Sequence, residues 1–344
     1  MKPLRTLFPL TSLAMVAVAL AAGALVASSS SRSESASPPG QLLLAQLDRT
    51  ADSLDRWLLQ ASDPCSATAT VVARSAIRGL QEDVGLAIAN CLNLLDPEEV
   101  EACYGQAAED FAAGLEEMLS QLEARKEVCG LLGGGPYDPL IDPVDFVKQV
   151  DNPFFPLVPG TTMTYHKTSS EGFEVVEVTV TDDTKTVMGV ECVLVRAVET
   201  MDGVLVEDTL DYYAQDALGN VWYFGELSVS YDATGLVAGI EGSWEAGLDG
   251  AKPGLVMPAN PTVGMTFRQE FGIGVAEDIG TILGLDQSVR VSYGALDGCV
   301  EIQDFTALEE NEVEIKFYAP GFGFVLEIDE LTGETLELVS ITRN

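Results

Sequence analysis

The stretch YYAQDALGNVWYFGE (residues 212–226) is echoed further along the chain by FYAPGFGFVLEIDE (317–330). Both copies begin with an aromatic-Tyr-Ala triplet, pass through a glycine-containing turn, and continue as a run in which apolar residues recur at alternate positions. A period of two is typical of a half-buried β-strand. The two copies therefore predict two similar β-hairpins.

The similarity extends upstream of both hairpins. Each copy opens with a glycine that precedes a Met-Thr-aromatic triplet, and each later reaches a cysteine after a glycine-containing turn. The spacing from Gly160 to Cys192 is 32 residues, and that from Gly264 to Cys299 is 35. Offsets that agree this closely predict an internal duplication in which each half is a short antiparallel meander.

A single meander leaves one apolar face in water, so two copies are expected to curl into one strongly bent sheet. Six segments alternate in the manner of half-buried strands, namely 174–180, 191–198, 220–224, 288–293, 312–318 and 334–341. Turn sequences such as Met201-Asp202-Gly203 separate them and favour antiparallel hairpins. The second half of the chain is therefore predicted to be an antiparallel β half-barrel or barrel.

The first half of the chain carries four of the six cysteines, and their spacing indicates a helical hairpin. Cys65 and Cys129 are mirrored about Pro97, and so are Cys91 and Cys103. Within each predicted helix the two cysteines are 26 residues apart, or about 39 Å along the axis. Pairs so distant cannot share one metal ion, so we expect a disulfide at each end of the hairpin, Cys65–Cys129 and Cys91–Cys103.

Local signals agree with this hairpin. Asp63-Pro64 and Asp96-Pro97 each place a capping residue before a proline at the first helical position. Gly133-Gly134-Gly135-Pro136 ends the second helix, and leucines at helical spacing predict a further helix over about 41–61. The expected fold class is α+β with two domains, in which a disulfide-bonded helical hairpin or three-helix bundle precedes the β domain.

The N-terminus is predicted to be an export signal. Lys2 and Arg5 precede an apolar run of 15 residues, whereas a membrane-spanning helix needs roughly 20. An uncleaved anchor is the alternative. The expected segments are a signal peptide (1–27), a flexible linker (28–40), a helical domain (41–135), a Pro-rich connector (136–158) and a β domain (159–344) with repeats over about 159–231 and 262–341. Export implies a periplasmic or extracellular location, where disulfides form.

Composition limits the classes of partner. The 344-residue chain has 54 acidic and 18 basic residues, a net charge of −36, and 47% hydrophobic residues. Such a charge repels phosphate, so we expect neither nucleic acid nor an anionic membrane surface as a partner. The hydrophobic content is sufficient to fill a core in each of two domains.

The two remaining cysteines, Cys192 and Cys299, occupy matching places in the predicted repeat. Two interpretations stay open at this point. They form a third disulfide near the pseudo-twofold axis, or they are two buried free thiols.

The segments FPLVPGTTMTY, YYAQDALGNVWYFGE, GSWEAG and FYAPGFGFV resemble a group of uncharacterised secreted bacterial proteins. That group shares a proline-leucine-glycine-aromatic opening and a closing Tyr-Ala-Pro-Gly-x-Gly strand. The likeness covers roughly 152–341, and Met163 stands where an aromatic residue is common. It implies export and a fold similar to the half-barrels of periplasmic lipoprotein carriers, and it implies no activity.

Candidate ligand-binding residues come from the second half of the chain. Trp222, Tyr223 and Trp244 are predicted to line a cavity of the sheet, and Arg268 to fix the polar end of a ligand. The alternative is that the tryptophans belong to the core and Arg268 pairs with a neighbouring glutamate. A second hypothesis, calcium binding, involves four acids: Glu245, Asp249, Glu277 and Asp278.

Catalytic signatures are scarce. His166 is the single histidine, and no GxSxG, HExxH, P-loop, GxGxxG or CxxC motif is present. No cofactor is expected apart from the calcium of the second hypothesis. The sequence therefore favours a non-catalytic binding protein for an apolar or amphipathic ligand. The rival interpretations are a structural or protein-interaction module and a calcium-dependent surface protein.

Overall fold

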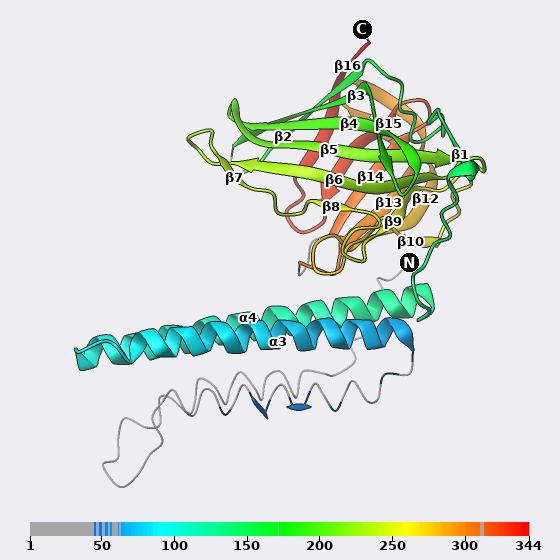
Figure 1. The fold of residues 1–344 in the computed structure, drawn as a ribbon. Helices are drawn as coiled ribbons and strands as arrows, with labels where there is room; N and C mark the ends of the chain where they lie inside the picture. Colours follow the sequence, from blue (N-terminus) through cyan, green and yellow to red (C-terminus); the bar gives the residue numbers. More distant parts are fainter. Residues whose placement is uncertain are drawn as a thin grey trace. The chain divides into compact units, whose positions relative to one another are not determined.

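The structure is a computed structural model that describes residues 63–170, 172–309 and 313–343, together with 45, 48, 49, 52, 53, 56 and 61. The predicted export signal and linker lie outside the described residues, and the helix expected over 41–61 lies mostly outside them. The chain divides into two compact units, with the boundary between Gly130 and Leu131. Helices make up the described part of the first unit and a large sheet makes up the second (Figure 1).

Both predicted helices are confirmed, together with their caps. Helix α3 (Pro64–Cys91) begins after Asp63, whose carboxylate accepts a hydrogen bond from the Ser66 N–H at 2.8 Å. Helix α4 (Pro97–Leu132) begins after Asp96, whose carboxylate accepts from the Glu98 N–H at 2.8 Å. These bonds satisfy N–H groups that have no partner within the helix.

The two helices form an antiparallel hairpin whose two disulfides are those predicted. Cys65–Cys129 and Cys91–Cys103 each join Cα atoms 5.6 Å apart. Between these crosslinks the helices share an apolar core in which Ile77, Phe111 and Leu122 are at most 1% exposed. Neither helix is apolar enough over a sufficient length to cross a bilayer, as far as the described residues go.

Removing the disulfide next to the hairpin turn tests its contribution. We expect the double variant Cys91→Ser/Cys103→Ser to lose about 3 kcal/mol of unfolding free energy, because the crosslink restricts the unfolded chain. Urea unfolding followed by circular dichroism at 222 nm measures the loss. The matched control is Ala89→Ser/Ala102→Ser, which changes two exposed neighbours; equal stability of the two double variants would contradict the expectation.

The sheet of the second unit is antiparallel throughout and nearly closed into a barrel. Its path runs β10-β12-β13-β14-β15-β16-β2-β3-β4-β5-β6-β9-β11, and it curls so that β13 to β15 lie across from the early strands (Figure 1). The main strands are β2 (Thr161–Thr168), β3 (Phe173–Val187), β4 (Val190–Met201), β5 (Val204–Asp216), β6 (Val221–Tyr231), β12 (Asp278–Val291), β13 (Gly294–Thr306), β14 (Val313–Ala319), β15 (Gly323–Asp329) and β16 (Thr335–Arg343). The shorter elements are η2 (Pro143–Asp145), β1 (Phe146–Val147), β7 (Val237–Gly239), β8 (Trp244–Glu245), β9 (Lys252–Met257), β10 (Thr266–Arg268) and β11 (Glu270–Phe271). The predicted α+β fold class is thus confirmed.

One short segment, residues 266–271, joins the two edges of this sheet. Its first part, β10, pairs with β12, and its last part, β11, pairs with β9. Gln269 lies between the two parts, and its backbone carbonyl approaches Gly254 so closely that a side chain at that position would collide with it. Closure of the sheet therefore depends on a glycine at position 254.

This contact makes Gly254→Ala a sensitive test of closure. We expect the variant to lose about 3 kcal/mol of unfolding free energy, because the new Cβ forces β9 away from residues 266–271. Gly135→Ala is the matched control, since a Cβ there meets no atom within 4 Å. Guanidinium unfolding followed by tryptophan fluorescence compares them, and an unperturbed Gly254→Ala variant would refute the closure model.

The two quoted stretches form corresponding hairpins, β5–β6 and β14–β15. Tyr213 faces Tyr223 in the first, Tyr318 faces Phe324 in the second, and each pair follows a shift in strand register. Equivalent contacts also occur at the start of each predicted repeat. The Gly160 N–H donates to the Val180 carbonyl at 2.9 Å, and the Gly264 N–H to the Ile282 carbonyl at 2.8 Å. These correspondences fit the expected duplication, which stays a prediction.

The third disulfide is not formed. Cys192 and Cys299 are both buried free thiols, in agreement with the second interpretation. They belong to different core clusters, and five strands separate β4 from β13 along the sheet. Matching positions in two similar meanders therefore do not meet when the meanders curl into one sheet. Burial raises the pKa of the Cys192 thiol to about 12, which keeps it unreactive.

Candidate functional site

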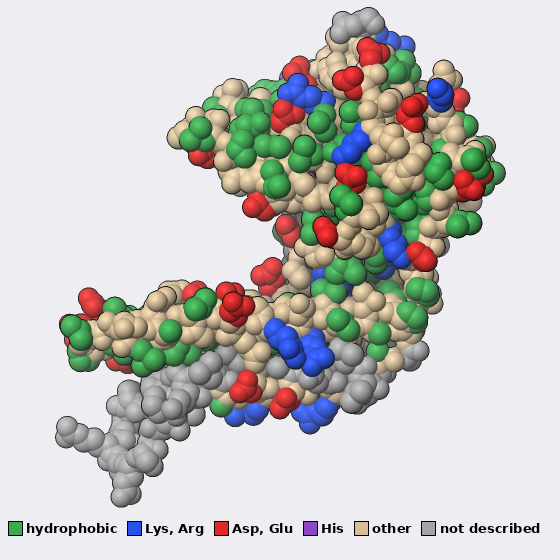
Figure 2. Space-filling model, in the orientation of Figure 1, with side chains coloured by type: hydrophobic (Ala, Val, Ile, Leu, Met, Phe, Trp, Pro, Cys, Tyr) green, Lys and Arg blue, Asp and Glu red, His purple; other side chains and the backbone are tan. Residues whose placement is uncertain are grey.

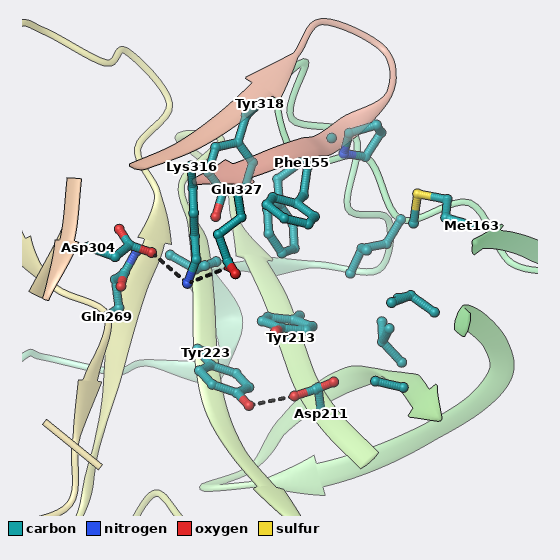
Figure 3. Close-up of a pocket in the computed structure, with 18 of the residues that line it drawn as sticks. Phe155, Met163, Asp211, Tyr213, Tyr223, Gln269, Asp304, Lys316, Tyr318 and Glu327 are labelled. Carbon is teal, nitrogen blue, oxygen red and sulfur yellow. Dashed lines mark hydrogen bonds and ion pairs between the residues drawn. The ribbon is translucent and has the colours of Figure 1, made fainter. Parts of the chain in front are cut away.

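A cavity of about 330 Å³ lies within the curled sheet. Neighbouring lining residues on one strand are two positions apart, for example Val195 and Ala197 on β4 or Lys316 and Tyr318 on β14, as expected for a shared inward face. The lining comprises Phe155, Pro156, Leu157, Met163, Tyr165, Val178, Val195, Ala197, Asp211, Tyr213, Tyr223, Val256, Gln269, Glu270, Asp278, Asp304, Lys316, Tyr318, Phe322, Gly323, Phe324 and Glu327. The cavity thus has both apolar and charged walls (Figure 3).

The apolar wall includes a loop that precedes β2. Phe155 packs edge-on against Tyr213, with ring centroids 5.1 Å apart, and lies 6.2 Å from Tyr318. Leu157 pairs with Val150 through a backbone hydrogen bond of 2.9 Å. Part of the stretch expected to be a connector (136–158) therefore forms a wall of the cavity.

Hydrogen bonds hold this loop against the sheet. The side-chain oxygen of Gln215 accepts from the N–H groups of Asp151 and Asn152 at 2.9 and 2.8 Å. The Asn152 amide in turn donates to the Gly219 carbonyl at 2.9 Å. Gln215 and Asn152 are almost fully buried, so these bonds are shielded from water and fix the loop firmly.

The charged wall contains one half-buried lysine, Lys316. The Lys316 ammonium lies 2.9 Å from Glu314. It also lies 3.1 Å from Asp304 and 3.7 Å from Glu327 (Figure 3). Burial favours a lower pKa for Lys316, but Asp304, Glu327 and Glu314 outweigh it and hold its pKa well above the ordinary value. Lys316 is therefore a fixed positive charge that these three carboxylates surround.

A second group of carboxyls lies near the paired tyrosine rings. Tyr213 and Tyr223 stack with centroids 4.6 Å apart, and the Tyr223 hydroxyl donates to Asp211 at 2.5 Å. Burial raises the pKa of Asp211 to about 6. Glu226, opposite Asp211 in the β5–β6 ladder, has its pKa raised to about 8 by burial and by the Asp211 charge.

Glu270, on the short strand β11, is a half-buried member of this group. Burial, followed by repulsion from Asp278 and Glu226, raises its pKa well above the usual range. Among the described residues, none forms a hydrogen bond or ion pair with its carboxylate. Desolvation and the neighbouring acids therefore favour the protonated form of the Glu270 carboxyl.

Of the four ligand-binding residues expected from the sequence, the structure places one in the cavity wall and three elsewhere. Tyr223 lines the cavity, whereas the other three are absent from its walls. The Trp222 indole donates to Asp216 at 3.0 Å, and Trp244 is buried behind Tyr223 with ring centroids 5.4 Å apart. The Arg268 guanidinium lies over the rings of Tyr137 and Phe271.

The four acids of the calcium hypothesis are also dispersed. Asp278 lines the cavity, Glu245 pairs with Lys185 at 2.7 Å, and Glu277 accepts from the Gly274 N–H at 2.7 Å. Asp249 lies in an exposed turn with a positive φ of 49°. The described residues contain no group of three or more His, Cys, Asp or Glu that could hold a metal ion.

Several residues of the site were missed by sequence reasoning, above all Asp211, Glu270, Asp304, Lys316 and Glu327. Strand alternation carried part of the signal, since Lys316 is in phase with Tyr318 and Asp211 with Tyr213. A charged residue two positions from an inward-facing aromatic residue on the same strand indicates that the interior of the sheet is partly polar. Elsewhere acids are scattered over the visible face rather than gathered in one patch (Figure 2).

No protein-family model and no curated protein matches the sequence. A similar solved structure is that of a "putative lipoprotein from Parabacteroides distasonis ATCC 8503", with 13% sequence identity over 55% of this chain and 98% of that chain. Its TM-score is 0.29, which is too low to carry an argument. The resemblance to the group of secreted bacterial proteins therefore stays a prediction.

Proposed function

We propose that the sheet unit is a small-molecule-binding module that takes an amphipathic ligand into its interior. The observation that carries this proposal is the cavity of about 330 Å³ in the curled sheet. Ligand sites typically occupy roughly 300–1,000 Å³, with mainly apolar walls and a few placed polar groups. The rival interpretation, a structural or protein-interaction module, predicts a sheet interior filled with side chains and does not account for this cavity.

We place this module in an exported protein, either periplasmic or extracellular. Two disulfides crosslink the helical hairpin, and such bonds are typical of oxidising compartments. The basic residues and the apolar run near the start of the sequence support the same assignment.

Filling the cavity tests the proposed function. Ala197 lines the cavity from β4, so Ala197→Phe is expected to occupy space that the ligand needs. We expect the wild-type protein to bind the uncharged dye Nile red saturably and Ala197→Phe to bind it at least about tenfold more weakly. Fluorescence titration measures both affinities.

The matched control is Val198→Phe, one position along the same strand and therefore on the opposite face of the sheet. It should bind the dye as the wild type does, while circular dichroism shows both variants folded. Wild-type protein without saturable binding, or a dye that binds Ala197→Phe equally well, would refute the proposal.

A further inference from the structure

We infer that the ligand is an organic cation, in which an ammonium group is attached to an apolar body. The inference rests on the proposed function and names the chemical class that the cavity takes. It follows from three features of the lining. These are the excess of acidic groups, the Glu270 carboxyl without a protein partner, and the tyrosine rings near the acids.

The walls carry an excess of acid. Five carboxyl groups and one lysine line the cavity. Lys316 is already surrounded by Asp304, Glu314 and Glu327. Lys316 also acts on Glu270 and Asp278, but no second basic side chain lines the cavity with Asp211, Glu270 and Asp278. A cationic group is the complement that this wall lacks.

Glu270 points to the position of that cation. Its half-buried carboxyl lines the cavity, and among the described residues none forms a hydrogen bond or ion pair with it. A carboxyl that lines a cavity without a protein partner is available to pair with a cationic group of a ligand. The charged groups that act on it are Asp278 on β12, Glu226 on β6, Lys316 on β14 and Asp211 on β5. Three of these four are acidic.

Aromatic faces suit an organic ammonium ion. Tyr213, Tyr223 and Tyr318 all line the cavity near the acids, and Figure 3 shows the Tyr213 ring between Phe155 and the Asp211–Tyr223 pair. Ring faces attract cations, and quaternary ammonium groups are held in this way. The apolar wall with Phe155, Val178 and Met163 then accommodates carbon atoms, which a hydrated metal ion does not possess.

Binding of a cation should release protons. Among the cavity-lining carboxyls, those of Glu270 and Asp278 have raised pKa values. A cation beside them favours their ionised form, so they lose protons when it binds. Affinity for a ligand of fixed positive charge is therefore expected to increase with pH from 5 to 8.

Three ligands with the same alkyl chain test the inference: octyltrimethylammonium, 1-octanol and octyl sulfate. Isothermal titration on the full chain at pH 8 and moderate salt should show the cation binding at least about tenfold more tightly than the alcohol, with the sulfate weakest. The preference for the cation should shrink at pH 5.

Glu270→Gln is the decisive variant because it keeps the shape and removes the charge. It should lose the preference for the cation while its ligand-free melting temperature stays the same or rises, which a merely structural role would not produce. Glu191→Gln, an exposed acid on β4, is the matched control and should behave like the wild type.

The outcomes separate the two proposals. If all three ligands bind with equal affinity and Glu270→Gln changes nothing, the proposed function stands and the inference of a cation is overturned. If none of the three binds and Nile red also fails to bind, the proposed function itself is refuted. Binding of octyl sulfate in preference to the cation would likewise overturn the inference.

Discussion

The ligand-free sheet unit is expected to lose about 5 kcal/mol of unfolding free energy as the pH is raised from 5 to 8. Burial raises the pKa of Asp211 and Asp304 to about 6, of Glu327 to about 7 and of Glu226 to about 8. Carboxyls in an unfolded chain have pKa values near 4. Between these limits the folded state holds more protons than the unfolded state, so its stability falls as the pH rises.

The magnitude follows from the size of these shifts. Each pKa unit corresponds to about 1.4 kcal/mol, and water that reaches the cavity screens part of the effect. Guanidinium unfolding of the full chain, followed by tryptophan fluorescence at several pH values, measures the slope. High salt during the experiment screens repulsion among the surface acids, and it screens the buried carboxyls much less.

Glu226→Gln should flatten this slope, because Glu226 has the highest pKa of the four carboxyls, about 8. The exposed control Glu191→Gln should keep the wild-type slope. Stability that is constant or that increases between pH 5 and 8 would contradict the protonation states assigned to the cavity. Saturating octyltrimethylammonium should reduce the loss at pH 8, since the cation compensates the ionised acids.

The second large effect is expected for Lys316→Met. This change removes the positive charge beside Asp304, Glu314 and Glu327 but keeps most of the apolar side chain. Breaking a buried ion pair from one side costs about 3–5 kcal/mol, and here three acids lose their shared partner. We expect a loss near the lower end of that range at pH 8, because the Lys316 side chain is 22% exposed, and a smaller loss at pH 5, where Asp304 and Glu327 are protonated.

Two further variants make the Lys316 result interpretable. Lys148→Met removes an exposed lysine from the same unit and should change stability by less than about 0.5 kcal/mol. The double variant Lys316→Met/Asp304→Asn should recover part of the loss, because it also removes one of the uncompensated charges. If Lys316→Met is as stable as Lys148→Met at pH 8, the lysine does not neutralise the acids of the cavity.

Much of the fold was predictable because its signals are local. Asp63 and Asp96 cap helices whose first residues are prolines, and the period of the apolar residues identifies each strand. The disulfides were predictable for a related reason. Mirrored spacing about Pro97 leaves a single way to pair four cysteines along an antiparallel hairpin.

The site was predicted far less completely than the fold. Alternation shows that Lys316 and Tyr318 share a face, but it does not show which other strand they meet. Glu270 belongs to a strand of two residues, which is too short for any periodic signal. The loop with Phe155 was expected to be a connector, since its prolines indicate only that a helix or central strand cannot continue there.

The sequence by itself determined the helices, their crosslinks, the strands and the inward or outward direction of most strand residues, because caps, cysteine spacing and side-chain period act over a few neighbouring positions. Tertiary structure alone decided that residues 266–271 join both edges of the sheet, that Cys192 and Cys299 stay apart, and that acids from β5, β11 and β12 line the same cavity as Lys316. These features depend on how far the sheet curls and where it closes. Curl and closure are set by the packing of the whole unit, in which strands distant in sequence become neighbours.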